Sequence, residues 1–165
     1  MTDPTKPVPL SDPGVMIATV FGIGRIRPAP GTWGSLAALP LPLLAPAGFD
    51  PLLLIPAAAL AFIIGCWAAN RYQQLSGAHD AGEVVIDEVC GQWIALCLVA
   101  LTPIAILAGF VLFRLFDIVK PWPIRWADKN IGGGFGVMLD DVLAGVAAAV
   151  CLYGIALIFG WPTRF

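Results

Sequence analysis

The residues best suited to chemistry are acids and cations that stand close together late in the sequence. Residues 113–141 read FRLFDIVKPWPIRWADKNIGGGFGVMLDD and hold four Asp, two Arg and two Lys, in a chain of which only 12% is charged. Arg114, Asp117 and Lys120 follow at intervals of three, which places a carboxylate between two cations on one helix face. Such a row is either an ion-pair network on a helix surface or a site whose cations bind phosphate.

Two pairs of adjacent acids, Asp87–Glu88 and Asp140–Asp141, stand where apolar helices are expected to begin. A single carboxylate at a helix start commonly caps the helix or offsets its dipole. Two pairs in a chain so poor in charge favour an oxygen-rich site for a hard divalent cation, with Mg²⁺ as the first choice.

Other segments offer further phosphate contacts. The glycines at 132–134 and Gly136 either form a turn or present backbone N–H groups to an anion. Thr32 and Ser35 either cap the helix that follows them or bind phosphate at its N-terminus.

The remaining reactive residue types argue against several other chemistries. His79 is the single histidine, so a zinc hydrolase or a phosphohistidine route with a second His has little support. Neither the motif of cysteine phosphatases nor that of aspartyl phospho-enzymes is present, which leaves metal-assisted chemistry on a phosphate. The cysteines stand singly, which argues against a disulfide framework; they are Cys66, Cys90, Cys97 and Cys151.

The elements that position these residues are expected to be membrane helices. Hydrophobic residues make up 59% of the chain and the mean hydropathy is +0.86, whereas a soluble domain would carry about twice the charge. The length fits one domain, and a net charge of -2 gives no field that would favour nucleic acid. The sequence therefore predicts an all-α integral membrane bundle with no nucleic-acid partner.

The order of polar and apolar segments predicts the topology. If the polar segments 24–35, 70–91 and 114–141 build one site, they must meet on the same side of the membrane, with hairpin tips at 49–51 and 102–103. About five membrane helices with two hairpins satisfy this, the last running from about Leu139 to Phe159. Nearly all cations fall in the polar segments, so the positive-inside rule makes that face cytoplasmic.

Smaller features complete the prediction. Residues 1–14 are too polar and proline-rich for a signal peptide and are expected to form a flexible tail before a membrane domain at 15–165. Trp122 and Trp126 are candidate interfacial anchors, and Arg125 and Lys129 could face lipid phosphates. Small residues in the last helix reflect either close helix packing or an alanine-rich composition; they are Ala144, Gly145, Ala148 and Ala149.

Three blocks of the sequence closely resemble the phosphatidylglycerophosphatase A family and come in the family's order. They are APGTWGSLAALP at 29–40, HDAGEVVIDEVCGQW at 79–93 and FRLFDIVKPWPIRWADKNIGGGFGVMLDDVLAG at 113–145. The resemblance covers nearly the whole chain from about Phe21 onward. It implies a multi-pass enzyme of the bacterial inner membrane that uses Mg²⁺ to remove the terminal phosphate of phosphatidylglycerophosphate, giving phosphatidylglycerol and inorganic phosphate.

The resemblance also carries site residues onto this sequence. The family's acidic positions fall on Asp80, Asp87, Glu88, Asp117, Asp140 and Asp141; its hydroxyls fall on Thr32 and Ser35, and its basic residues on Arg114 and Lys120. On this basis we expect metal ligands at Asp87, Glu88, Asp117 and Asp141. Arg114 and Lys120 would hold the phosphate as charge develops, and an attacking water is expected as nucleophile. An acyl phosphate formed on Asp117 or Asp140 is the alternative.

The sequence argues against three other classes of protein. A transporter would bind an ion or substrate at broken helices, but no inverted repeat is visible. A phosphatidyltransferase would carry a spaced aspartate motif opening DGxxAR, which is missing. A purely structural membrane protein has little reason to gather its acids in two segments. Oligomeric state is left open.

Overall fold

The computed structural model describes residues 8–77 and 82–163, and regular structure there is helical apart from one isolated bridge between Val99 and Thr163. The longer helices are α4 (Leu54–Ser76), α5 (Ile86–Leu96), α6 (Pro103–Val119) and α8 (Gly133–Phe159). Short helices connect them: α1 (Pro13–Ala18), η1 (Ile23–Arg25), α2 (Pro30–Ala37), α3 (Pro40–Leu43), η2 (Pro51–Leu53) and α7 (Ile124–Asn130). The prediction of an all-helical fold is confirmed.

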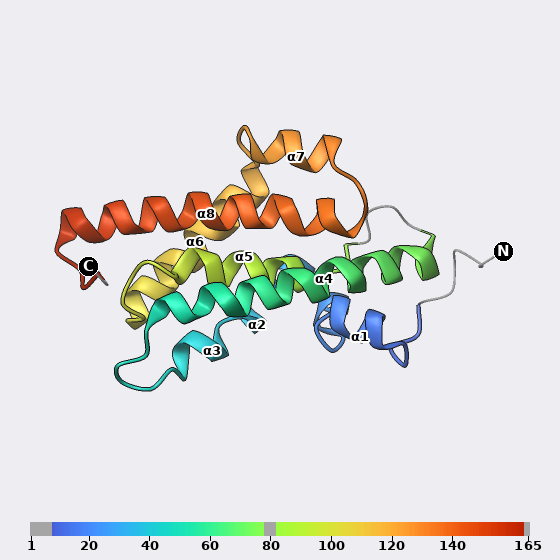
Figure 1. Cartoon of the computed structure of the whole chain (residues 1–165), viewed down its shortest axis with the longest axis horizontal. Coiled ribbons are helices and arrows are strands. Elements are labelled where there is room, and N and C mark those ends of the chain that lie inside the picture. The colour runs from blue at the N-terminus through green and yellow to red at the C-terminus, as the bar shows by residue number, and fades with distance from the viewer. Residues whose placement is uncertain (1–7, 78–81, 164–165) are drawn as a thin grey trace.

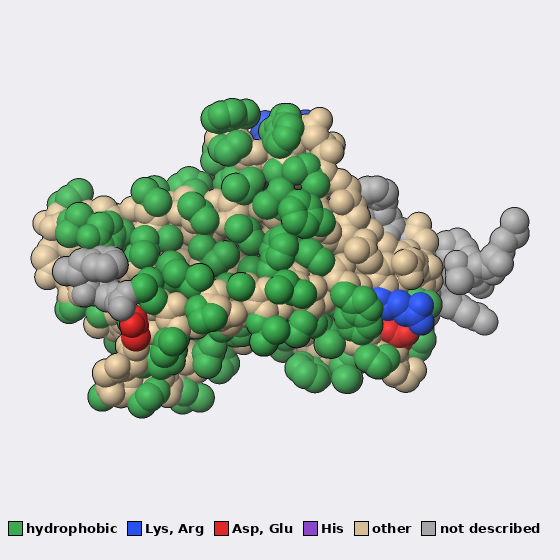
Figure 2. Space-filling model, viewed as in Figure 1, with side chains coloured by type: hydrophobic (Ala, Val, Ile, Leu, Met, Phe, Trp, Pro, Cys, Tyr) green, Lys and Arg blue, Asp and Glu red, His purple; other side chains and the backbone are tan. Residues whose placement is uncertain are grey.

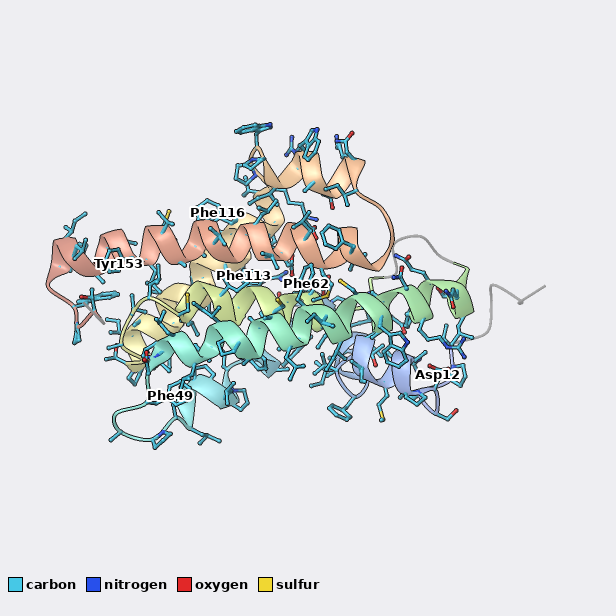
Figure 3. The ribbon with its side chains drawn as sticks, viewed as in Figure 1. Asp12, Phe49, Phe62, Phe113, Phe116 and Tyr153 are labelled. Carbon is cyan, nitrogen blue, oxygen red and sulfur yellow. The ribbon has the colours of Figure 1, made fainter. Side chains whose placement is uncertain are left out.

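The two longest helices set the shape of the molecule. α4 and α8 run antiparallel along the long axis with α5 beside them, while α7 lies against α8 on the side away from α4 (Figure 1). The end of α4 meets the start of α8, where the Asn70 Oδ1 accepts a hydrogen bond from the Gly134 N–H at 2.6 Å. Further along, Phe62 of α4 and Phe135 of α8 stack edge to face with ring centroids 5.5 Å apart; Figure 3 labels Phe62.

The small residues of α8 allow it to pack closely on α5. A Cβ at Gly145 would lie 2.4 Å from the Gly91 carbonyl oxygen, so the two backbones nearly touch. Ala144 and Ala148 are fully buried in a cluster with Phe113 of α6, whose side chain lies between α8 and α5 (Figure 3). Of the two interpretations of these small residues, the structure therefore supports close packing.

Pro51–Ser76 and Gly133–Phe159 are long and apolar enough to cross a membrane. Only 28% and 33% of the most apolar stretch of these two helices is buried inside the structure, whereas the core helix of a soluble protein would be mostly buried. Large apolar side chains such as Ile63 and Val150 face outward, and Figure 2 shows a face dominated by hydrophobic side chains. These features indicate a membrane protein; the expected five spans stay a prediction.

Some local predictions differ from the structure. α8 begins at Gly133 rather than near Leu139, so Asp140 and Asp141 lie inside the helix instead of at its start. The glycine run belongs to that first turn because Gly134 packs on the Cys66 carbonyl oxygen, 2.1 Å from where a Cβ would stand. Of the expected tail, Val8 is buried and Asp12 caps α1, so packed structure begins before residue 15.

Candidate functional site

Residues from all three polar segments line one pocket of about 370 Å³. Ala29–Gly31 contribute the start of α2; Gln73 of α4, Gly82 and Val84 before α5, and Asp87 and Glu88 at the start of α5 also line it. The ends of α6 and α7 and the first turns of α8 close the other side. The prediction that these segments meet is confirmed.

Three carboxylates form the acidic side of the pocket. One oxygen from each of Asp87, Glu88 and Asp141 lies within 4.8 Å of the others, close enough for a single cation to bind all three. Asp87 and Glu88 stand in the first turn of α5, and Asp141 reaches them because Gly91 and Gly145 let α5 and α8 approach closely.

The surroundings of these acids favour a bound cation. Glu88 is 9% exposed and Asp141 is 3% exposed, and one oxygen of each has no hydrogen-bond partner among the described residues. Burial raises the pKa of Glu88 to about 8, and burial together with the nearby Glu88 carboxylate raises the pKa of Asp87 well above its ordinary value. A divalent cation would remove this penalty, so the donor set fits Mg²⁺.

Arg114 connects the acidic cluster to α2. Its Nη1 lies 2.7 Å from the Asp117 Oδ2 and 3.8 Å from the Glu88 Oε1, and it donates to the Ser35 Oγ at 3.3 Å. Asp117, expected to ligate metal, lines the pocket but is paired with Arg114. Of the two interpretations of this row, the ion pair is present between Arg114 and Asp117, and metal binding by Asp117 stays a prediction.

Lys120 occupies the opposite wall. Its ammonium binds Asp128 at 2.6 Å and Asp140 at 2.5 Å, joining the end of α6 to α7 and α8. Burial alone would lower the pKa of Lys120, but the bonds to these two carboxylates outweigh burial and hold the pKa above its usual value. The other Asp140 oxygen is buried without a partner among residues 8–77 and 82–163.

The two hydroxyls expected to bind phosphate lie away from the pocket lining. Ser35 is fully buried, and its Oγ donates to the Gly31 carbonyl oxygen and accepts from Arg114. Gly31 lines the pocket instead, since a Cβ there would stand 2.2 Å from the Glu88 Oε1. Ser35 therefore supports the site through Arg114, and a direct role for Thr32 stays a prediction.

The sequence interpretation missed some residues of the site. Asp128 was passed over because it stands alone between basic residues, and only the fold brings it to Lys120. Gln92, one turn after Glu88, lies behind the site rather than in the pocket lining; it is fully buried and its amide has no partner among the described residues. In the sequence, the sign that could have pointed to Gln92 is a polar amide side chain within an otherwise apolar helix. The predicted Asp80, with His79, lies outside the described residues.

The pocket places buried carboxylates beside two cations, Arg114 and Lys120, and the longest helices are suited to a membrane. These features define the class of the protein as a helical membrane protein with a site suited to phosphate chemistry. The profile of the phosphatidylglycerophosphatase A family matches residues 16–156. The chain therefore belongs to the phosphatidylglycerophosphatase A family and is a phosphatase.

Curated relatives agree over nearly the full length. A phosphatidylglycerophosphatase A of Haemophilus influenzae is 41% identical over 154 residues, covering 93% of this chain and 94% of the relative. One of Escherichia coli is 41% identical over 155 residues, covering 93% and 88%. A Bacteroides thetaiotaomicron protein provisionally named a phosphatidylinositol-3-phosphatase is 42% identical over 147 residues, covering 84% and 90%. No solved structure matches the chain significantly.

Proposed function

We propose that this protein hydrolyses the terminal phosphate monoester of phosphatidylglycerophosphate, with Mg²⁺ as cofactor, to phosphatidylglycerol and inorganic phosphate. The observation that carries the proposal is the trio Asp87, Glu88 and Asp141 beside Arg114 and Lys120 in one pocket. Family membership and two relatives named for this activity support the choice of substrate.

The proposed place of the reaction is the bacterial inner membrane, with the pocket facing the cytoplasm. α4 and α8 would span the bilayer. α4 would form the first expected hairpin with the short helices before it, and α5 and α6 would form the second, which gives about five membrane helices. α6, with 17 residues, is at the short end of the length that a span needs. The cations of the polar segments support the cytoplasmic side.

In the proposed mechanism Asp87, Glu88 and Asp141 hold the metal. Mg²⁺ bound there would neutralise phosphate charge and lower the pKa of a water. Arg114 and Lys120 bind the phosphate oxygens, and Asp117 orients Arg114 through their 2.7 Å pair. These residues supply the positioning and charge compensation on which phosphoryl transfer depends.

The bond changes are those of a monoester hydrolysis. The water oxygen bonds to phosphorus, the bond from phosphorus to the glycerol oxygen breaks, and the water's protons pass to the products. Asp140 is the candidate to accept a proton from the water, because its Oδ1 is buried without a partner among the described residues while Lys120 holds its Oδ2. Direct attack by Asp117 or Asp140, forming an acyl phosphate that water then cleaves, is the alternative.

A second candidate substrate comes from the relative provisionally named a phosphatidylinositol-3-phosphatase. Both lipids present a phosphate monoester to the same kind of site. Purified protein should therefore be assayed for phosphate release from phosphatidylglycerophosphate, phosphatidylinositol 3-phosphate and phosphatidic acid at equal surface concentration. A clear preference for the first supports the proposal. A preference for the second would replace it, and no release from folded protein would mean that none of these lipids is the substrate.

A further inference from the structure

A second depression lies beside the pocket and is formed by the end of α6, the turn at 121–123 and α7. This α7 groove has a volume of about 440 Å³ and is lined by Lys120, Trp122, Arg125, Trp126 and Lys129, among others. Figure 2 shows Lys or Arg side chains among hydrophobic ones over α7, which Figure 1 places at the edge of the molecule. The groove thus combines positive charge with aromatic surface.

The cations of the groove are available to an anion. Arg125 and Lys129 are exposed, and neither forms an ion pair within residues 8–77 and 82–163. Arg125 donates one hydrogen bond to the Val119 carbonyl oxygen at 3.2 Å, which holds its guanidinium near the groove. A guanidinium held in this way beside a free ammonium is well suited to a phosphate group.

An apolar stripe leads from the body of α6 to the groove. Its exposed side chains recur at helical spacing and lie on one face; they are Ile104, Leu107, Val111, Leu115 and Ile118. Trp122, 83% exposed, follows at the end of the stripe, and Trp126 is 55% exposed. Such aromatic side chains commonly sit at the level of lipid headgroups, so acyl chains could lie along α6 with the headgroup at the groove.

The groove and the catalytic pocket share a wall. Lys120 lines both, and its partner Asp128 lines the pocket. A ligand with two phosphates joined by a short linker could place one in each depression. Phosphatidylglycerophosphate has this form, because a glycerol unit separates its terminal monoester from its phosphodiester.

We propose that the α7 groove binds the phosphodiester of the lipid whose terminal phosphate occupies the pocket, so that Arg125 and Lys129 select substrates with this second phosphate. The proposal rests on the proposed function and names the part of the chain that recognises the rest of the headgroup. It commits to the substrate's own headgroup rather than to bulk anionic lipid.

Three substrates in neutral detergent separate these possibilities. Phosphatidylglycerophosphate has the diester and the acyl chains, its deacylated form has the diester alone, and glycerol 3-phosphate has neither. For Arg125→Gln and for Lys129→Gln we expect KM to rise roughly tenfold for the first two substrates, with kcat little changed. The increase in KM for glycerol 3-phosphate should be much smaller.

Arg27→Gln is the matched control, because Arg27 is exposed, lies outside both depressions and loses the same charge. A KM increase equal in the Arg27 variant, or equal for glycerol 3-phosphate, would overturn the proposal. An increase confined to the acylated substrate would also overturn it and assign the groove to the bilayer surface. If the wild type released phosphate from none of the substrates, the proposed function itself would fail, which is a distinguishable result.

Discussion

Lys120 binds Asp140 across 20 residues of sequence, with Nζ 2.5 Å from Oδ2, and this contact joins the end of α6 to α8. Lys120 also has the left-handed backbone conformation that ends α6, at φ 44°. The position of the Lys120 ammonium is therefore fixed both by the backbone conformation of Lys120 and by the contact of its side chain with Asp140. A cation held in this way is ready to meet a phosphate without reorganising.

Replacing Lys120 by Met should lower kcat/KM by about 10- to 100-fold, since one charge-assisted bond to the phosphate is lost. Asp128→Asn is the matched comparison, because Asp128 is the more exposed of the two Lys120 partners and Asp140 remains. Asp128→Asn should lower kcat/KM by less than about tenfold. Steady-state kinetics on detergent-solubilised protein would measure both, and equal losses would argue against a phosphate contact by Lys120.

Gly31→Ala should reduce activity strongly while the protein stays folded. The added Cβ would stand 2.2 Å from the Glu88 Oε1 and 3.0 Å from the Arg114 Nη1, both at the ends of side chains that can shift. Displacement of this size costs about 10-fold or more in rate. Activity and melting temperature measured together would test this, and an unimpaired variant would show that the Glu88 position is not critical.

Gly145→Ala should destabilise the protein by about 1–3 kcal/mol, because its Cβ would overlap the Gly91 carbonyl oxygen and force α5 from α8. Gly154→Ala, on the same helix but with nothing within 4 Å of the added Cβ, is the control. It should be neutral or slightly stabilising. Thermal unfolding in detergent would report both, and equal melting temperatures would contradict the close crossing.

Asp12 pairs with Arg71 at 2.9 Å, tying the cap of α1 to α4 (Figure 3). The side-chain hydrogen bond from Arg71 lowers the pKa of Asp12 below its ordinary value of 3.8. A carboxyl whose pKa is lowered by folding stabilises the fold above its unfolded pKa, and the stabilisation is lost as pH falls through the folded pKa. Asp12→Asn should therefore lower the melting temperature at neutral pH.

The deficit of the Asp12 variant should shrink as the pH falls below about 4, where the wild-type carboxyl also becomes protonated. Arg71→Gln should show the same pattern, and the double variant should be little worse than either single one. If the loss of melting temperature persists unchanged in acid, then packing of the Asp12 side chain, not its charge, causes the loss of stability.

Local spacing predicted some of these relationships and could not predict others. The pairing of Arg114 with Asp117 follows from helical periodicity alone, and the adjacent acids at 87–88 were recognised as exceptional in an apolar chain. The contacts of Lys120 with Asp128 and Asp140, and of Gly31 with Glu88, depend on how separate helices cross, which spacing does not encode.

The start of α8 shows the same limit. A glycine run normally favours a turn, yet Gly134 and Gly136 are helical. A Cβ at Gly134 would meet the Cys66 carbonyl oxygen of α4, so packing of α8 on α4 requires glycine there. Tertiary packing thus outweighed local preference. That packing places Asp141 within the helix, where it faces Asp87 and Glu88.

The most direct test of the central claim is phosphate release from phosphatidylglycerophosphate in detergent micelles, with Mg²⁺ and with EDTA, by wild type and Asp141→Ala. Asp141 is chosen because it is the one acid of the trio on α8. We expect release by the wild type only with Mg²⁺, and a loss of at least about 100-fold in the variant at limiting Mg²⁺. Full activity of the variant at limiting Mg²⁺, or undiminished release in EDTA, would contradict a metal site at this cluster.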